Sequence, residues 1–248
     1  MKRKVPFTVV YEDERIAVFD KASGIAVGPG RWEEEGERLD RMAASFLGMR
    51  LFTVHRIDRG TSGLVVFAKD AETHAFLSGA FENRLVRKRY TAVVNGRPVW
   101  KETVCDLPLL PDGNKRHLTI VEKYRGKKSL TRFRLVILAG NYSILEALPE
   151  TGRTHQIRVH LAALGHPVVC DPLYGSGKPV FLSSFKKNWR GDPFEEKPLL
   201  DRLGLHAAEL VLPARAGVSG PLVFSAPLPR DMAALAGQME KAAGKKFA

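Results

Sequence analysis

The chain has 248 residues, 44% of them hydrophobic and 27% charged, which is typical of a globular protein, and no stretch approaches the ~18 consecutive apolar residues that cross a bilayer. Its 39 Lys and Arg outnumber its 27 Asp and Glu, giving a net charge of +12 and a field that attracts polyanions such as nucleic acid, although a merely soluble surface is an alternative explanation. The basic tail of residues 1–6 leads into no signal peptide, so we expect a cytoplasmic protein without membrane contact.

The first half of the chain is expected to contain four strands and two helices. Apolar and β-branched runs predict the strands, and Asp70 is suited to cap the second helix. Strands are expected at 7–11, 16–19, 63–69 and 88–95, and helices at 33–47 and 71–84.

The second half is expected to continue with strands at 131–137, 142–148, 207–212 and 222–224, and a terminal helix at 230–243. A further helix is expected to be capped by Thr154, with Ile157 and Leu161 on one face and Gly165 just past its end. Residues 178–197 have the composition of a surface insertion. Runs of strands without strict alternation with helices favour an α+β fold, and no linker divides residues 1–248, so we expect one domain.

The first segment with chemical potential is 54–63, where Asp58 lies between Arg56 and Arg59. Neighbouring cations favour an ionised carboxylate, which suits a nucleophile or a general base. Gly60 and Gly63 allow a tight backbone turn beside it. The alternative is a turn at the entry of the next strand, with surface arginines.

The second segment is 88–96, where strand alternation places Tyr90, Ala92 and Val94 on one face. A tyrosine on such a face can stack against a nucleobase, and the preceding cations can meet phosphate. A half-buried strand tyrosine with a solvated basic end is the competing interpretation.

The third segment is 150–160, in which Arg158 follows the core residue Ile157 and Arg153 precedes the expected helix. A guanidinium at the edge of a core needs a fixed partner, and the sequence offers Asp58, although composition does not prove the pairing.

No metal site is expected. His155 and His160 lie five residues apart rather than the four of a zinc-binding helix. Cys105 and Cys170 are isolated in the sequence, which favours two buried thiols over a zinc site or a disulfide.

Taken together, the three segments resemble the RluA family of pseudouridine synthases, which modify bacterial ribosomal and transfer RNA. The family's His-Arg-Leu-Asp-x-x-Thr-Ser-Gly motif corresponds to residues 55–63, with Ile57 in place of Leu, and its Gly-Arg-Thr-His-Gln-Ile-Arg-Val-His segment is complete at 152–160. The family's tyrosine strand corresponds to 88–96, and the likeness runs from about residue 7 to about 228. It implies a catalytic domain with a mixed, largely antiparallel central sheet flanked by helices. Many members carry a small RNA-binding domain before the catalytic one, which is not expected here.

The resemblance also implies a reaction that breaks the N-glycosidic bond of uridine, turns the uracil and rejoins it through carbon 5, with neither metal nor organic cofactor. Asp58 is the implied catalytic residue, and Arg158 is expected to pair with it. Tyr90 would pack on the flipped uracil, Arg56 would fill the gap left by the base or hold its phosphate, and Leu210 is a candidate for the apolar side of the pocket.

Contacts to the RNA backbone are expected from His55, Arg153 and Gln156. The protein is expected to be a monomer. The sequence does not reveal which RNA or which uridine is modified, nor whether Asp58 attacks the ribose, adds to uracil or removes a proton.

Two rival functions remain at this level. A non-catalytic RNA-binding protein with the same fold would show the same charge but has no need for Asp58 together with Arg153 and Arg158. A glycosidase or nucleosidase generally needs a second carboxylate near the first, and the three segments supply only one such acid.

Overall fold

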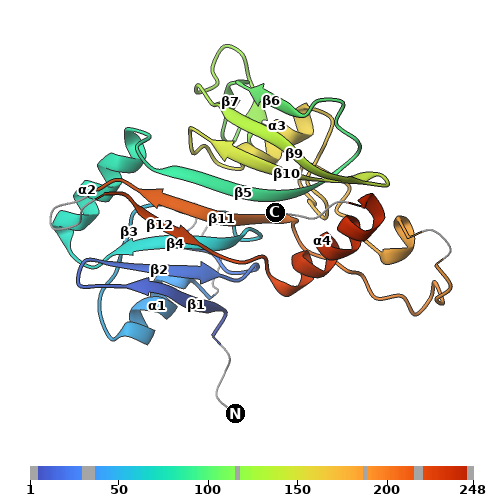
Figure 1. The fold of residues 1–248 in the computed structure, drawn as a ribbon. Helices are drawn as coiled ribbons and strands as arrows, with labels where there is room; N and C mark the ends of the chain where they lie inside the picture. Colours follow the sequence, from blue (N-terminus) through green and yellow to red (C-terminus); the bar gives the residue numbers. More distant parts are fainter. Residues whose placement is uncertain (1–4, 30–36, 115–117, 187–188, 215–219, 245–248) are drawn as a thin grey trace. The chain divides into compact units, whose positions relative to one another are not determined.

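The structure is a computed structural model and describes residues 5–29, 37–114, 118–186, 189–214 and 220–244. Its contacts divide the chain into two compact units. Unit 1 comprises residues 1–88 and 206–227, and unit 2 comprises residues 89–205 and 228–248. Figure 1 traces the elements of each unit along the chain.

Unit 1 is built on a sheet with the strand order β1-β2-β4-β11, in which β12 also pairs with β11 and β3 with β4. The pairing of β4 with β11 is parallel, with Ser62 opposite His206, and the others are antiparallel. The elements are β1 (Phe7–Glu12), β2 (Ile16–Lys21), α1 (Leu39–Leu47), β3 (Phe52–Thr53), β4 (Ser62–Ala68), α2 (Ala71–Glu82), β11 (Leu205–Leu212) and β12 (Leu222–Ser225).

The core of unit 1 follows from the sequence of its central strand. All seven residues of β4 are buried, as a strand with neighbours on both sides requires. Leu64 and Val66 pack with Leu210 and with Leu77 of α2. Asp70 caps α2 as predicted, because its carboxylate accepts the backbone N–H of Thr73 at 2.8 Å.

Unit 2 is built on an antiparallel sheet with the order β5-β10-β9-β6 and a separate pair, β7-β8. Its elements are β5 (Arg87–Asn95, which starts at the end of unit 1), β6 (Glu102–Cys105), β7 (Leu109–Leu110), β8 (Ile120–Val121), β9 (Thr131–Ala139), β10 (Tyr142–Pro149), α3 (Gln156–Ala163), the 3-10 helix η1 (Leu182–Ser184) and α4 (Arg230–Ala243).

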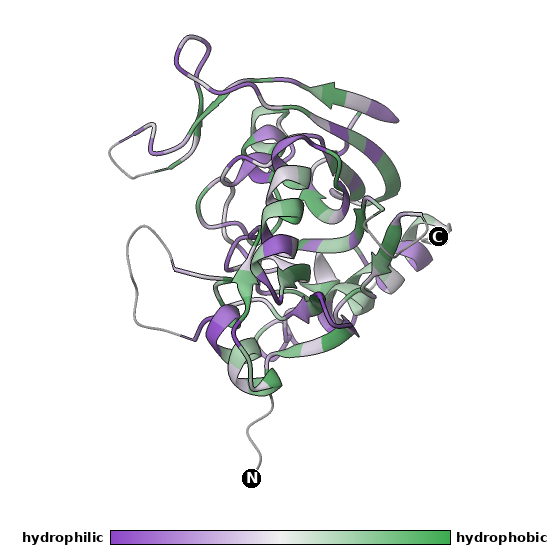
Figure 2. Cartoon of the chain, turned by 90° about the vertical axis from the view of Figure 1, so that its left-hand side faces the viewer, coloured by the Kyte–Doolittle hydropathy of each residue, from purple (hydrophilic) through white to green (hydrophobic). Residues whose placement is uncertain are grey.

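Alternation along the strands of unit 2 decides which helix covers which face. In β9, Phe133 is buried between the exposed Arg132 and Arg134, and Figure 2 shows such alternation as green and purple bands along the strands. Ile157 of α3 packs in one hydrophobic cluster with Ala92, Val94 and Leu145, whereas α4 packs in another with Val93 and Ile144. Neighbouring residues of a strand point to opposite faces, so α3 and α4 cover opposite faces of this sheet.

The predicted α+β fold with mixed, largely antiparallel pairing is confirmed, and the predicted strands and the terminal helix are present. The cap predicted at Thr154 is wrong: α3 starts at Gln156, and its N-cap is His155 in the left-handed region, with φ 54° and no side-chain cap. Gly165 follows the helix at φ 82° as expected. The short strands β3, β6, β7 and β8 were not predicted.

Three predicted segments fall partly outside the described residues. The helix expected at 33–47 is described only from residue 37, and α1 starts at Leu39; the expected N-terminal tail is described only from residue 5. Among the described residues of 178–197, Val180 alone is buried, which agrees with a surface segment. In the described part of the chain, no helix is long and apolar enough to span a membrane.

Candidate active site

Asp58 lies in unit 1, in the loop that joins β3 to β4. Its backbone carbonyl accepts the N–H of Thr61 at 3.0 Å, which closes a turn just before β4 begins. Ile57 is buried, Asp58 is half-buried and Arg56 is exposed, with one long contact of 3.4 Å to the carbonyl oxygen of Pro29. The loop is therefore anchored by an apolar residue and presents charged side chains on either side of it.

The segment after β2 fixes the backbone of this loop. The fully buried Lys21 donates through its Nζ to the carbonyl oxygens of Ala22 and Ile25 at 2.9 Å and of Arg59 at 3.2 Å. Carbonyl dipoles thereby offset part of the cost of burying the ammonium group. No role was predicted for Lys21, although a lysine at the end of an apolar strand indicates that its ammonium group has partners.

Two further bonds reach the same loop. The hydroxyl of Ser23 donates to the carbonyl of Gly60 at 2.7 Å, and the N–H of Gly24 donates to the carbonyl of Arg59 at 2.8 Å. Together with Lys21, they hold the residues that directly follow Asp58.

His55 is not a cation for phosphate. Its Nε2 accepts the backbone N–H of Val66 at 3.0 Å, and its ring stacks on Phe81 at 4.4 Å. Burial, and then the charge of Lys88, lower the pKa of His55 to about 3, so the ring is neutral at pH 7.

The first residues of β4 are joined to β11. The buried Ser62 hydroxyl and Nδ1 of the buried His206 lie 3.0 Å apart. Gly63 has φ 111°, and a Cβ there would lie 2.3 Å from the carbonyl oxygen of Ala207, so only glycine fits. Leu210, further along β11, is 2% exposed and belongs to the core of unit 1.

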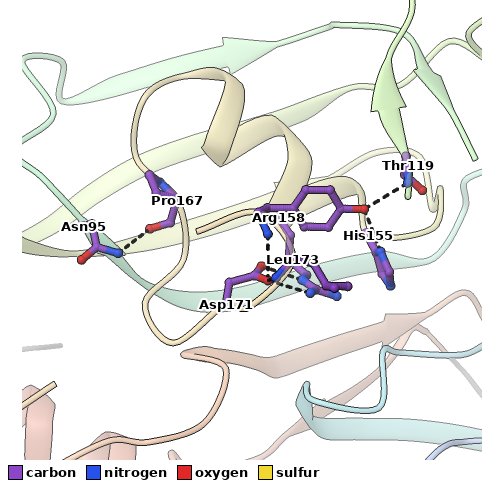
Figure 3. Close-up of polar contacts among 8 residues, drawn as sticks. Asn95, Thr119, His155, Arg158, Pro167, Asp171 and Leu173 are labelled. Atoms are coloured by element: carbon purple, nitrogen blue, oxygen red, sulfur yellow. Dashed lines mark hydrogen bonds and ion pairs between the residues drawn. The ribbon is translucent and has the colours of Figure 1, made fainter. Parts of the chain in front are cut away.

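Arg158 lies in unit 2, where it forms a buried ion pair that was not predicted. Its Nε and Nη2 each lie 2.8 Å from an oxygen of Asp171, and their side chains are only 6% and 0% exposed. Figure 3 shows the carboxylate of Asp171 facing the guanidinium of Arg158. Asp171 also accepts the N–H of Leu173 at 2.9 Å. Burial is the largest single influence and raises the pKa of the Asp171 carboxyl, but Arg158 and the backbone N–H groups together outweigh it, so the pKa lies below its usual value.

Tyr174 supports the same arginine. The Cζ of Arg158 lies 5.1 Å from the centroid of the Tyr174 ring, a cation–π distance. The Tyr174 hydroxyl accepts the N–H of Thr119 at 3.1 Å and lies 2.9 Å from Nδ1 of His155; Figure 3 shows Thr119 and His155 at either end of this network. Asp171 and Tyr174 lie in a sequence segment that shares the family likeness, but only the fold shows that they meet Arg158.

Gln156 is a structural residue of the α3 start. Its Oε1 accepts from the Thr151 hydroxyl at 2.7 Å and from the N–H of Arg153 at 3.0 Å, and its Nε2 donates to the carbonyl of Leu130 and the hydroxyl of Thr131. These four bonds use the full capacity of the amide, which leaves it no group with which to meet RNA. Arg153 itself is half-buried, and its Nε lies 3.4 Å from the carbonyl oxygen of Lys128.

Tyr90 is half-buried on β5, opposite Ala147 of β10. Its side chain packs against the cluster that contains Ala92 and Val94, as the predicted alternation requires. The first motif thus lies in unit 1, and the tyrosine strand and the third motif in unit 2. The predicted ion pair between Asp58 and Arg158 joins residues of different units and stays a prediction.

Comparison with known proteins decides the family. A profile described as RNA pseudouridylate synthase matches residues 15–163. The chain belongs to the RluA family of RNA pseudouridine synthases. Enzymes of this kind are intramolecular isomerases.

Two relatives show the extent of the similarity. The chain is 34% identical over 240 residues to "Ribosomal large subunit pseudouridine synthase D" of Zymomonas mobilis, covering 92% of this chain and 71% of the relative. It is 36% identical over 212 residues to "Dual-specificity RNA pseudouridine synthase RluA" of Vibrio vulnificus, covering 83% and 77%. The solved structure of human RNA pseudouridylate synthase domain containing 4 shares the fold, with a TM-score of 0.70, 21% identity, and coverage of 94% and 92%.

Proposed function

We propose that this pseudouridine synthase isomerises uridines in ribosomal or transfer RNA, with Asp58 as its catalytic residue. The names of the two relatives point to ribosomal RNA in one case and to a dual-specificity RNA enzyme in the other. The observation that carries the assignment is the loop of Asp58: it bears the family motif, and the groups of Lys21, Ser23 and Gly24 hold its backbone.

In this proposal, the target nucleotide is flipped out of its stack at a cost of a few kcal/mol. Asp58 then acts as an ionised carboxylate close to the glycosidic bond, by attack on the ribose, addition to uracil or removal of a proton. The bond between ribose C1′ and N1 breaks, the uracil turns, and a bond forms between C1′ and C5. C5 then loses its proton and N1 gains one, so no atom is gained or lost overall.

Arg158 is proposed to hold Asp58 charged and oriented. A guanidinium has five N–H donors in a planar fork, enough for more than one carboxylate. The bidentate pair with Asp171 and the ring of Tyr174 fix the plane of this guanidinium within unit 2, which supports a positioning role.

Substrate contacts are proposed for side chains of both units. Tyr90 would pack on the flipped uracil, and Leu210 would contribute to the apolar side of the pocket. Arg56 and Arg153 would meet phosphate, because their guanidinium groups are charged and at least partly exposed. His55, which is neutral, and Gln156, whose amide is fully hydrogen-bonded, would contribute to RNA binding indirectly. They would do so by fixing the segments that carry Arg56 and Arg153.

The two units are proposed to form one catalytic domain, since the motif residues are divided between them. Residues 178–197 are the proposed source of target choice. We also propose that the enzyme works in the cytoplasm, as a monomer and without metal or organic cofactor.

The test is conversion of uridine in total ribosomal and transfer RNA by the purified protein, mapped by pseudouridine sequencing. Wild type should form pseudouridine. Asp58→Asn should lower kcat by at least about a hundredfold, as loss of a general base does, with an unchanged circular dichroism spectrum. Wild type that binds RNA but converts none would favour the non-catalytic RNA-binding protein. Full activity in Asp58→Asn would remove Asp58 from the mechanism.

A further inference from the structure

A basic turn outside the three motifs displays an exposed aromatic ring. In the segment 122–128, the side chains of Lys123, Arg125, Lys127 and Lys128 are exposed around Tyr124. Tyr124 itself is 87% exposed. Four exposed cations therefore lie within four residues of an exposed ring outside the core of unit 2.

The single acid of this segment does not cancel the charge. Glu122 is half-buried; its Oε1 accepts the N–H of Tyr124 at 3.1 Å, and its Oε2 lies 3.7 Å from Nη2 of Arg125. The carboxylate is thus engaged in shaping the turn, and the segment keeps a net positive charge.

The turn is anchored rather than loose. Lys127 and Leu109 exchange backbone hydrogen bonds of 2.8 and 3.0 Å, and the fully buried Ser129 donates to the carbonyl of Lys127 at 2.9 Å. The N–H of Gly126 donates to the carbonyl of Glu122 at 3.0 Å, and a Cβ on Gly126 would lie 2.1 Å from that oxygen. A ring on such a fixed backbone loses little conformational entropy when it is covered by a ligand.

The position of the turn relates it to the third motif. The carbonyl oxygen of Lys128 lies 3.4 Å from Nε of Arg153. The cations of the turn and Arg153, which is proposed to meet phosphate, therefore lie on one part of unit 2.

We propose that the turn of residues 122–128 is an RNA-contact surface, in which Tyr124 stacks on an unpaired base and the surrounding cations meet the neighbouring phosphates. This inference rests on the proposed action on RNA. An aromatic face stacks on any base, and flanking Lys and Arg follow the backbone, which is the chemistry of single-stranded RNA binding. Nζ of Lys123 lies 5.9 Å from the centroid of the Tyr124 ring, so the cation is placed beside the site of stacking.

The experiment uses the full chain with Asp58→Asn, so that the substrate is not consumed, and a fluorescent RNA hairpin whose unpaired loop contains uridine and 2-aminopurine. Stacking on Tyr124 should quench the 2-aminopurine. Tyr124→Ala should weaken binding at least about fivefold, in keeping with the loss of one stacked base, and should abolish this quenching, whereas Tyr124→Phe should retain both.

Charge is tested separately with Lys128→Gln and, as a matched control, Lys241→Gln at an exposed position of α4. Loss of one phosphate contact should lower the slope of log Kd against log salt by about 0.7, in Lys128→Gln only. The proposal would be overturned if Tyr124→Ala left binding and quenching unchanged. It would also be overturned if none of these variants changed the affinity of the Asp58→Asn protein for the hairpin. Pseudouridine formation by wild type on total RNA is scored independently, so a protein that binds through Tyr124 without converting uridine would refute the proposed function alone.

Discussion

The loop of Asp58 and helix α3, which carries Arg158, are held by different kinds of hydrogen bond. The loop is held through its own carbonyl groups, which accept from Lys21, Ser23 and Gly24. Helix α3 is held through its side chains: Gln156, Arg158 and His160 are all buried and bonded to groups of unit 2.

The difference shows that the polar side chains of a family motif can be used mainly for internal structure in one segment and not in another. The bonds that Lys21, Ser23 and Gly24 make to this loop involve its backbone and not the side chains of Arg56 and Asp58.

In a helix held by its side chains, most polar residues bond to other parts of the protein. Membership of the family motif therefore does not by itself make a residue of α3 a substrate contact. Gln156 illustrates this in α3. In the loop of Asp58, His55 is an exception to the backbone anchoring, because its Nε2 accepts the N–H of Val66.

The largest effect is expected from breaking the ion pair of α3. Asp171→Asn should lower the free energy of unfolding by about 3–5 kcal/mol, because it removes one partner of a buried charge pair. The matched control is Asp231→Asn, which breaks a bidentate pair with Arg202 whose side chains are 19% and 35% exposed, and should cost about 1 kcal/mol. Urea denaturation measures both, and equal losses would contradict the role given to burial.

The next effect tests the backbone anchoring of the loop. Lys21→Met should cost about 2–3 kcal/mol, since buried carbonyl groups lose a charged donor, and should lower kcat about tenfold with little change in KM, because the loop of Asp58 is less well fixed. Lys69→Met is the control. The Nζ of Lys69 donates to the backbone carbonyl of Asp13 and to the carboxylate of Glu12, at the other end of β4. It should lose stability and keep kcat; loss of kcat in both variants would refute a specific role for Lys21.

A pH effect separates His55 from a phosphate-binding cation. Burial lowers its pKa from 6.5 to about 3 in the folded protein, so its contribution to stability is complete above pH 6.5 and is lost as the pH falls towards 3. Below pH 6.5 wild type should therefore lose up to about 1.4 kcal/mol per pH unit more than His55→Gln. Denaturation curves at pH 7.5 to 5 measure this; parallel pH dependences would mean that the imidazole is charged in the folded protein.

The smallest loss of stability is expected from changing Tyr174, whose ring lies beside Arg158. Tyr174→Phe keeps the ring beside the guanidinium but removes the hydroxyl that bonds Thr119 and His155, and should cost about 1 kcal/mol. Tyr174→Leu, which also removes the cation–π contact, should cost more. Equal stability of the two variants in urea would show that the ring contributes nothing.

The sequence predicted those features that depend on neighbours along the chain. The cap by Asp70, the strands around β4 and the glycine after α3 follow from local propensity and periodicity. Arg158 was also expected to need a fixed partner, because a guanidinium at the edge of a core is costly alone.

Features set by tertiary contact were not predictable in the same way. The observed partner of Arg158, Asp171, is thirteen residues away across a loop, a distance to which no periodicity applies. Thr154 has a side chain suited to an N-cap, but the N-cap position of α3 is taken by His155. The backbone of His155 is left-handed, and its ring is bonded to Tyr174. Strands of two residues, such as β7 and β8, are too short to show alternation.

The pairing of β4 with β11 has a consequence for how the protein is made. Ser62 and His206 are 144 residues apart, and the whole segment between β5 and the start of β11 is synthesised in that interval. Until β11 emerges from the ribosome, Ser62 and Gly63 at the start of β4 lack their strand partner, and Leu64 and Val66 lack the contact with Leu210. Closing so long a loop is slow, so the completion of unit 1 is a late event of folding. Chains interrupted before residue 212 lack part of the apolar core of this unit, and the uncovered apolar side chains favour aggregation.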